Sequence, residues 1–362
     1  MSVFEEQPPL INRSELSKWL KNNYSYLNFK NIKLTSLNSE RDKNFLLQEV
    51  NNTKYVIKIS NPKESLDQLK YQDILINYLR SNKKLKSIYP KICHKKILFL
   101  KDKKNRNCAV RILTYIEGNM YAKSKINTKI EESLGTILAL QSKHLQSFIH
   151  KDSIRKFDWD PSNIKWTKKF LKLFKGFEKK LIEDSINQYE HFVLKNIKNL
   201  KFSVTHGDPN NYNIVVSNDK IIGLIDFGDS IYAPSINDLS IALSYALMSS
   251  NNFYKSLKNI VGSYNNINPL TKDEIYSLLG LIKSRLTITL VMAAKQRKKY
   301  PNNKYLSISE KNAWSLMSKL HQIDPYFFIA VIKEICNLDP IDNFNEIFQL
   351  IKNQQYENMF NL

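Results

Sequence analysis

The chain has 362 residues, 42% of them hydrophobic, which is enough to bury a large core in one large domain or in two lobes. The formal net charge of +21 is mainly Lys spread along the whole length, which indicates a compositional bias rather than a nucleic-acid-binding surface. Cys93, Cys108 and Cys336 are few and far apart, which excludes a disulfide framework or a cysteine zinc site and favours the cytoplasm. We expect neither a secretory leader nor a membrane span, since no run of about 18 apolar residues occurs.

The first 115 residues are expected to form a small antiparallel sheet with helices, as a first lobe. A capped helix is predicted over 12–24, and three alternating strand-like runs follow at 31–37, 44–50 and 54–60. An amphipathic helix is predicted over 63–81, because its apolar residues recur at helical spacing. Two more strand-like runs are expected, at 95–100 and 108–116.

Residues 116–362 are expected to form a second, mainly helical lobe. Its predicted helices span 128–148, 165–200, 235–250, 272–300, 307–323, 325–337 and 341–362. The interruption is the block 203–231, which alternates strands with polar loops. The sequence therefore predicts an α+β fold of two lobes.

Acidic residues in this block stand beside strongly apolar strands, where they are disfavoured unless they are paired or bind a metal. In "HGDPNNYNIVV" Asp208 follows a strand, and Asn213 comes five residues later; Asp226 ends the next apolar run. A hairpin over 213–225 would bring Asn213 and Asp226 to one end of the sheet. Their two oxygens, with phosphates and waters, suit Mg²⁺. Asp208 would remain free to face a substrate hydroxyl.

This spacing is that of the protein-kinase catalytic loop followed by a D-F-G metal site. "HGD" stands where kinases have "HRD", and "DFG" occurs literally at 226–228. A kinase also needs a Lys on the third strand of its small lobe, and Lys58 stands there. The alternative for Lys58 is an exposed Lys on an edge strand.

These motifs resemble those of the aminoglycoside phosphotransferase/choline kinase superfamily, which has the protein-kinase-like two-lobe fold. The stretches "YVIKIS", "VRILTYIEG", "FDWD" and "DLSIALSYAL" extend the resemblance over about residues 25–337. A C-terminal "YL…W" pattern (305–314) points to the hydroxylysine kinase branch and to the phosphotransferase domains fused to class III aminotransferases.

The resemblance implies phosphoryl transfer from a nucleoside triphosphate to a hydroxyl of a small molecule. By position, Asp208 would be the catalytic base, Asn213 and Asp226 would bind Mg²⁺, and Lys58 would contact the α- and β-phosphates. The purine would meet the hinge at Thr114, Tyr115 and Ile116. The donor is ATP or GTP, since hydroxylysine kinase uses GTP.

The sequence departs from the kinase pattern at two points. The loop "LNSERDKNF" contains no glycine, so a glycine-rich phosphate cradle is missing, and Asn44 or nearby backbone amides would have to replace it. The helix after Lys58 offers Gln72 where a Glu is expected. A Gln can orient Lys58 by a hydrogen bond but supplies no charge.

For the acceptor, the resemblance suggests a hydroxylated amine or amino acid, with hydroxylysine first and ethanolamine, choline, homoserine and aminoglycosides as competitors. Asp158, Asp160 and Asp229 could meet its ammonium group, and Trp159 could line the acceptor site beside the two acids of its segment. A capped turn with a packed Trp explains "FDWDP" at least as well. Arg285 is either a substrate contact or a buried ion-pair partner. His206 is expected to order the catalytic loop, and Asp238 to brace it.

Two other classes stay open. A nucleotide-binding pseudokinase would keep the fold without the reaction, and the intact catalytic-loop residues argue against it. A nucleic-acid-binding protein is suggested by charge alone, without a binding motif or a clustered basic stripe.

Overall fold

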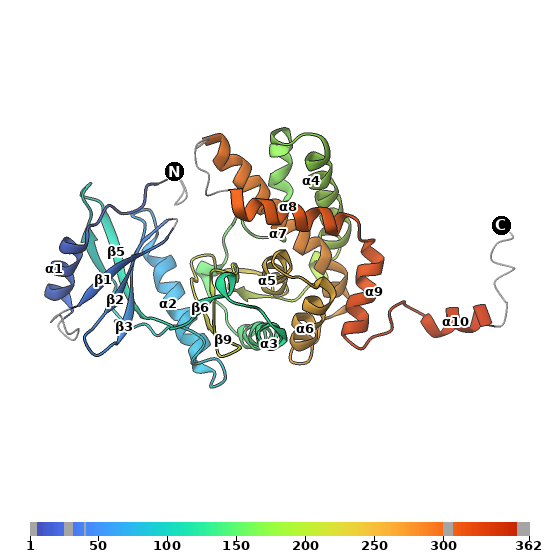
Figure 1. Cartoon of the computed structure of the whole chain (residues 1–362), viewed down its shortest axis with the longest axis horizontal. Helices are drawn as coiled ribbons and strands as arrows, with labels where there is room; N and C mark the ends of the chain where they lie inside the picture. Colours follow the sequence, from blue (N-terminus) through green and yellow to red (C-terminus); the bar gives the residue numbers. More distant parts are fainter. Residues whose placement is uncertain (1–5, 25–31, 40, 300–306, 353–362) are drawn as a thin grey trace. The chain divides into compact units, whose positions relative to one another are not determined.

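The computed structural model describes residues 6–24, 32–39, 41–299 and 307–352 (Figure 1). Residues 305 and 306 of the "YL…W" pattern and the end of the predicted segment 341–362 lie outside them. The chain divides into two compact units. The sheet unit comprises Met1–Ser124, Phe148–Arg155 and Tyr212–Ser230, and the helical unit comprises Lys125–Ser147, Lys156–Asn211 and Ile231–Leu362. The expected lobe boundary at residue 115 stays a prediction.

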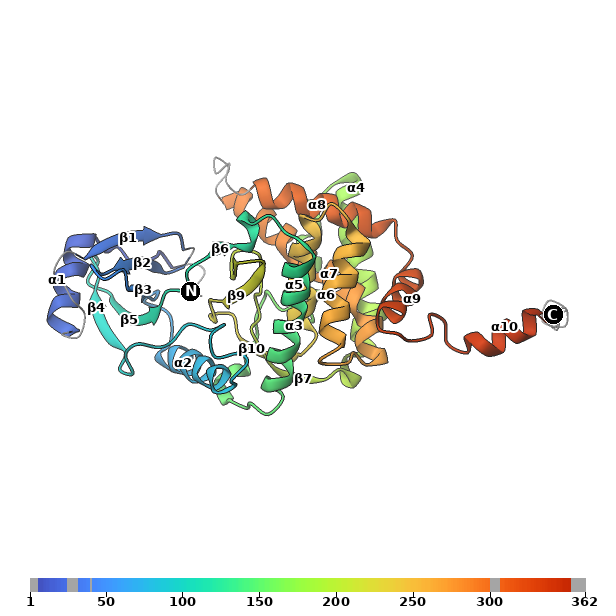
Figure 2. The ribbon, with the colours of Figure 1, turned by 60° about the horizontal axis from the view of Figure 1, so that its bottom comes forward.

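The sheet unit is built on five strands in the order β1-β2-β3-β5-β4, all antiparallel to their neighbours (Figure 2). The strands are β1 (Lys33–Leu37), β2 (Lys43–Gln48), β3 (Lys54–Ile59), β4 (Leu98–Lys101) and β5 (Asn107–Thr114). The predicted antiparallel meander is confirmed, and Lys58 lies on its third strand.

One face of this sheet packs against α1 (Arg13–Asn23), which begins with a capping box between Asn12 and Glu15. Leu16 and Leu20 of this helix share a buried apolar cluster with Phe45, Ile57, Ile59, Val110 and Ile112 of the strands. Because side chains alternate along a strand, the residues between these belong to the opposite face. That face meets α2 (Leu66–Ser81), where Arg111 donates to the Leu69 carbonyl oxygen at 3.3 Å.

A second sheet of the same unit contains β6 (Asn119–Met120), β8 (Ile214–Ser217) and β9 (Lys220–Leu224). β8 and β9 form a hairpin whose two turn residues, Asn218 and Asp219, have φ of 49° and 57°. A two-residue hairpin turn of this hand needs positive φ at both positions, which Asn and Asp tolerate. The turn sets the first pairs of the hairpin, and a bulge between Val215 and Val216 then shifts the register toward the end where the predicted metal ligands lie.

The helical unit consists mainly of α-helices, with a two-stranded sheet of β7 (Phe202–Thr205) and β10 (Ile231–Pro234). The helices are α3 (Thr128–Leu145), α4 (Gly176–Gln188), α5 (Asn237–Met248), α6 (Phe253–Asn265), α7 (Lys272–Lys299), α8 (Ser307–His321), α9 (Pro325–Ile335) and α10 (Phe344–Lys352). Figure 2 shows α3, α5, α6 and α7 side by side. The mixed α+β class is confirmed.

The predicted segment 165–200 is helical but broken into pieces, and one helix of this unit was missed. The segment 165–200 is not one helix: a 3₁₀ segment (Lys165–Leu173), α4, a π-helical turn (Tyr189–Leu194) and a short 3₁₀ turn (Ile197–Asn199) follow one another. Gly176 has φ of 51° and follows extended residues, which separates the first two pieces. Helix α6 was not predicted, although Asn252 caps it and Leu257, Ile260, Val261 and Tyr264 form its buried face.

α7 is the core helix of the helical unit. In the described ranges it is the one helix long and apolar enough to cross a membrane by length and composition, and 83% of its most apolar stretch is buried inside the protein. That burial is what a core helix shows. Its buried cations are paired, since Lys283 Nζ lies 2.5 Å from Asp184.

The contact between α3 and α6 depends on a glycine (Figure 2). A Cβ atom on Gly135 would lie 2.1 Å from the Ile260 carbonyl oxygen and 3.0 Å from the Tyr264 nitrogen. Backbone atoms of a packed helix cannot move aside cheaply, so we expect Gly135→Ala to lower the free energy of unfolding by about 1–3 kcal/mol in urea denaturation. Gly262→Ala in α6 is the matched control, because its nearest atom would be 3.7 Å away. The control should be neutral or stabilising by up to about 1 kcal/mol, and equal losses would contradict the packing argument.

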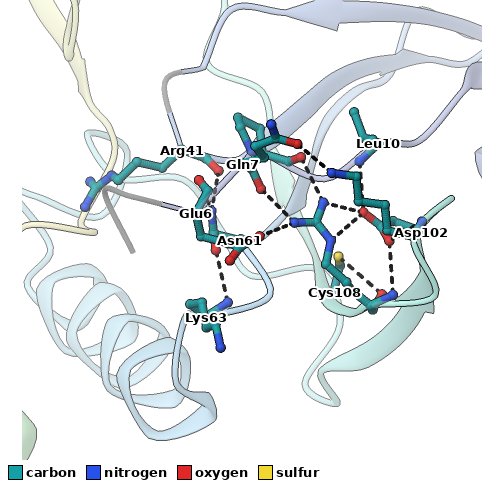
Figure 3. A network of polar contacts seen from close by, with 11 residues as sticks. Glu6, Gln7, Leu10, Arg41, Asn61, Lys63, Asp102 and Cys108 are labelled. Atoms are coloured by element: carbon teal, nitrogen blue, oxygen red, sulfur yellow. Dashed lines mark hydrogen bonds and ion pairs between the residues drawn. The ribbon is translucent and has the colours of Figure 1, made fainter. Parts of the chain in front are cut away.

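The segment before α1 is tied to the β4–β5 hairpin by a polar network around Asp102 (Figure 3). Arg106 donates to Asp102 from Nε at 3.0 Å and Nη2 at 2.6 Å, and to Glu6 and the Gln7 carbonyl oxygen from Nη1. Burial raises the pKa of Asp102, but hydrogen bonds from the Arg106 side chain and from backbone amides outweigh it and lower that pKa to about 2. The ionised form of Asp102 is therefore stabilised in the folded chain relative to the unfolded chain.

This network makes stability depend on pH. The folded Asp102 pKa lies below the unfolded value near 4, so its stabilisation is present above about pH 4 and is lost as the pH falls toward about 2. Between about pH 5 and pH 2, the free energy of unfolding of the wild type should fall by about 2 kcal/mol more than that of Asp102→Asn, as measured by chemical denaturation. Parallel pH profiles for the two proteins would contradict the assignment.

Candidate active site

The predicted site residues fall into two groups, one within each compact unit. The sheet unit holds Asn44, Lys58, Gln72, Thr114, Tyr115, Ile116, Asn213, Asp226 and Asp229, and the helical unit holds Asp158, Trp159, Asp208 and Arg285. Each group is built by its own strands, helices and hydrogen bonds.

A row of polar side chains crosses the sheet on the face of α2. Asn44, Lys58 and Arg111 are direct cross-strand neighbours on β2, β3 and β5. Neighbouring strands place such residues on the same face about 5 Å apart. Asn44 Oδ1 is buried and has no hydrogen-bond partner among the described residues, which suits a site that takes a ligand.

Lys58 makes an ion pair with Asp226, with Nζ 2.9 Å from Oδ1. The Lys58 side chain is 12% exposed, whereas that of Asp226 is 44% exposed. Asp226 has φ of 67°, a left-handed conformation that Asp adopts more readily than most residues, and it turns the chain sharply just after β9. The Phe227 ring that follows is buried 5.7 Å from the ring of Tyr89. The turn at Asp226 is thus anchored by a packed aromatic side chain.

The hairpin of β8 and β9 brings Asn213 and Asp226 to the same end. Ile214 pairs with Leu224, and the Ile225 amide donates to the Asn213 carbonyl oxygen at 2.9 Å. The expected hairpin is therefore confirmed. In the part of the chain that the structure describes, no three or more Asp, Glu, His or Cys side chains gather into a metal cage. One carboxylate and one amide oxygen fit a hard cation such as Mg²⁺ that takes its remaining ligands from phosphates and water.

Two residues in the middle of α2, Gln72 and Asp73, bind Arg111 rather than Lys58. Arg111 donates to Gln72 Oε1 at 2.7 Å and to Asp73 Oδ1 at 2.9 Å. The carboxylate that Lys58 contacts is that of Asp226. Arg111 was missed in the sequence, because its partners on α2 become visible only when β5 lies beside β3.

The predicted hinge residues continue β5. The Thr114 amide donates to the Lys91 carbonyl oxygen at 2.9 Å, and the Tyr115 amide to the Lys54 carbonyl oxygen at 3.1 Å. Ile116 lies against the hairpin, since a Cβ atom on Gly223 would approach its Cγ2 to 2.9 Å. A purine contact from Thr114 or Tyr115 would therefore have to use their carbonyl oxygens.

Asp229, a candidate for the acceptor ammonium, pairs instead with Arg41 at 2.7 Å. Burial lowers the pKa of Arg41, but the carboxylates of Asp229 and Asp226 outweigh it and hold that pKa above its ordinary value. Arg155 donates to the Gly228 carbonyl oxygen at 2.6 Å on the same turn. The sequence singled out neither arginine, because each lies far along the chain from the turn that it contacts.

In the helical unit, the loop that carries Asp208 is braced from α5, as expected. The buried Asp238 accepts from the amides of His206 at 2.8 Å and Gly207 at 3.0 Å, and from Gln141 at 2.9 Å. Burial raises the pKa of Asp238, and these hydrogen bonds act in the opposite direction. Gly207 has φ of 82°, which only glycine adopts without strain. His206 Nδ1 accepts from the Asp208 amide at 3.2 Å and so helps to order the loop.

Arg285 of α7 holds the Asp208 carboxylate. Its Nη2 lies 2.5 Å from Oδ1, while Asn210 donates to Oδ2 at 2.6 Å. The guanidinium stacks between the rings of Trp159 and Tyr245, at 4.9 Å and 5.5 Å from their centroids. The sequence left Arg285 as either a substrate contact or a buried ion-pair partner, and the structure contains the ion pair.

The two acids and the Trp of the "FDWDP" segment have different surroundings. Asp160 is a turn cap that accepts from the Ser162 amide at 2.9 Å and from Asn237 at 2.9 Å. Trp159 is half-buried on Arg285, whereas Asp158 is exposed. Asp158 thus remains the acidic side chain of this segment that a solvent-borne cation can reach.

The chain matches the model of the phosphotransferase enzyme family over residues 33–259. It is 31% identical to hydroxylysine kinase of Xenopus laevis over 232 residues. This aligned segment covers 59% of this chain and 62% of that relative. It is 27% identical to hydroxylysine kinase of Mus musculus over 82% of this chain and 86% of that one. Among solved structures, an amicoumacin kinase in complex with AMP-PNP and Ca²⁺ matches with a TM-score of 0.62 at 14% identity, covering 81% of this chain and 91% of that one.

The Arg285–Asp208 pair should contribute strongly to stability. The Arg285 side chain is 3% exposed, so Arg285→Met leaves Asp208 without its buried counter-charge, and we expect a loss of about 3 kcal/mol in urea denaturation. In an Asp208→Asn background the same change should cost at least about 1 kcal/mol less. Additive costs in the double-mutant cycle would contradict a direct pairing.

Proposed function

This chain belongs to the phosphotransferase enzyme family, and from that premise we propose that it transfers the γ-phosphoryl group of ATP or GTP to a hydroxyl of an amino alcohol or hydroxy amino acid. It is a small-molecule kinase by its family and its relatives. The observation that carries the proposed site is the ion pair of Lys58 with Asp226 at the end of the hairpin that also presents Asn213.

The residues proposed to bind the donor lie in the sheet unit. Lys58 contacts the α- and β-phosphates once the nucleotide draws it from Asp226, and the orphaned oxygen of Asn44 stands beside it on the sheet. Asn213 and Asp226 hold Mg²⁺, which neutralises charge on the phosphate oxygens when it is bound. The purine lies against the carbonyl edge of Thr114, Tyr115 and Ile116. Gln72 acts indirectly by holding Arg111, the cross-strand neighbour of Lys58.

Asp208 is the proposed catalytic base. Its carboxylate accepts the proton of the acceptor hydroxyl as that oxygen bonds to the γ-phosphorus, and the nucleoside diphosphate leaves. The transition state of such transfers is loose, so orientation of the hydroxyl contributes more than base strength. Arg285 and Asn210 hold one carboxylate oxygen each, which fixes the direction in which Asp208 points.

Hydroxylysine is the first candidate acceptor, because both relatives reported above carry that name. Its ammonium groups need an anionic contact, and we assign this to the exposed Asp158 beside Trp159, since Asp229 is engaged by Arg41. Ethanolamine, choline, homoserine and aminoglycosides are the competing acceptors.

The deciding experiment is nucleoside diphosphate release with ATP and with GTP over a panel of these acceptors. Turnover with one acceptor identifies the donor and the substrate together. Magnesium-nucleotide binding without turnover on any member of a broad panel would favour the nucleotide-binding pseudokinase, and no nucleotide binding at all would refute the proposal.

Asp208→Asn tests the catalytic base. It keeps the size of the side chain but removes its capacity to accept the proton, so we expect kcat to fall by about 10²–10⁴. Nucleotide affinity, measured by calorimetry, should change little. Near wild-type turnover would show that Asp208 has another role.

Asp226→Ala tests the metal site. It removes one proposed protein ligand of Mg²⁺, so the magnesium-dependent gain in nucleotide affinity should disappear in calorimetric titrations. Asp219→Asn at the exposed tip of the same hairpin is the matched control, because Asn also tolerates its left-handed backbone, and it should bind normally. Unchanged magnesium dependence in Asp226→Ala would place the metal elsewhere.

A further inference from the structure

The loop between β1 and β2 connects two strands of the sheet unit without a glycine. In kinases this loop covers the donor phosphates, and its glycines let backbone amides approach them closely. Its residues are Asn38, Ser39, Glu40, Arg41 and Asp42, each with a Cβ atom that hinders such a close backbone approach. The charge of the phosphates needs another partner here.

Arg41 of this loop reaches the turn that follows the predicted metal ligand. Its Nη2 lies 2.7 Å from Asp229 Oδ1, and a Cβ atom on Gly228 would come within 3.3 Å of the same nitrogen and 3.5 Å of Asp226 Oδ1. Arg41 and Lys58 are therefore two cations that approach Asp226, one from the β1–β2 loop and one from β3.

The backbone of Arg41 is held as firmly as its side chain. The buried Asn61 donates from Nδ2 to the Arg41 carbonyl oxygen at 3.2 Å and to the Glu6 carbonyl oxygen at 3.3 Å. The Asn61 amide donates to Asp42 Oδ1 at 3.0 Å, which fixes the next residue of the loop. In Figure 3 the Arg41 side chain extends away from this network. Hydrogen bonds thus hold Arg41 both at its backbone and at its guanidinium, so the side chain is preorganised for a ligand.

The chemistry of this group fits a phosphate chain. A guanidinium presents several N–H donors in a planar fork that matches phosphate oxygens, and Arg41 Nη2 donates to Asp229 Oδ1. The Asp229 side chain is 13% exposed and that of Arg41 is 22% exposed, so the pair is shielded but can be reached. A carboxylate that aims a guanidinium in this way restricts its rotamers before a ligand arrives.

We propose that Arg41 binds the phosphate chain of the donor nucleotide and that Asp229 positions it, so that this side chain replaces the missing glycine-rich cradle. The inference rests on the proposed function and adds a binding residue and a positioning residue to its donor site. Asp229 then serves the donor rather than the acceptor ammonium.

The test compares affinities of the full-length chain, with Mg²⁺, for the triphosphate donor and for its nucleoside by calorimetry. Arg41→Gln should weaken triphosphate binding at least about tenfold, the effect of one hydrogen bond to a charged group, and leave nucleoside affinity within about twofold. Arg41→Lys should recover part of the loss, because it restores the charge without the fork.

Lys43→Gln is the matched control. It removes one positive charge two residues away, but Lys43 contacts Ser36 and the Phe45 ring on the opposite face of the sheet. Its triphosphate affinity should stay within about twofold of the wild type. An equal loss in this control would mean that net charge alone attracts the nucleotide, and would overturn the proposal.

Asp229→Asn tests the positioning role. It should weaken triphosphate binding in the wild type and have little further effect in Arg41→Gln, whereas independent losses would show that Asp229 does not act through Arg41. Wild-type affinity in Arg41→Gln, or an equal loss for the nucleoside, would refute the role of Arg41 while leaving the kinase proposal intact. Failure of the wild type to bind either triphosphate would refute the proposed function itself.

Discussion

The sheet unit depends on the ion pair between Lys58 and Asp226. It joins the third strand of the five-stranded sheet to the end of the β8–β9 hairpin, which lies 168 positions later in the chain. The pair needs Lys58 on the face of α2, which the alternation of β3 determines, and it needs Asp226 in a left-handed turn anchored by the buried Phe227. Asn213 and Arg41 take their places around this pair.

In the helical unit, the main constraint is the charged Asp208 carboxylate, which must be held beside a largely apolar core. Asp208 is satisfied by Arg285, and Arg285 by two aromatic rings, so the cost of burying either charge alone is avoided. Asp238 satisfies the backbone of the loop that carries Asp208, because it accepts hydrogen bonds from the amides of His206 and Gly207. A rigid carboxylate is what a reaction dominated by positioning requires.

The two arginines that complete these arrangements, Arg41 and Arg285, illustrate how a kinase-like site can be adapted. Arg41 stands in a loop without glycine, and Arg285 stands in the middle of α7, whose most apolar stretch is largely buried. In each case the guanidinium is oriented by a carboxylate on another segment. In both cases charge and planar geometry fix the direction of a side chain, and for Arg41 we propose that they replace the glycine-dependent backbone contacts of other kinases.

The sequence by itself determined the class of fold, the antiparallel meander, the third-strand position of Lys58 and the hairpin that joins Asn213 to Asp226. These follow from short-range signals: alternation along strands, the Asn218–Asp219 turn and a motif of fixed spacing. Helix α6 was missed although its Asn252 cap and its apolar residues at helical spacing are local signals, whereas the breaks within 165–200 depend on single backbone angles. Only the tertiary structure decided that Gln72 holds Arg111, that Asp229 holds Arg41 and that Arg285 holds Asp208. Each of these pairs joins residues 39 to 188 positions apart, and a charged side chain finds its partner through the packing of whole elements, which no local pattern records.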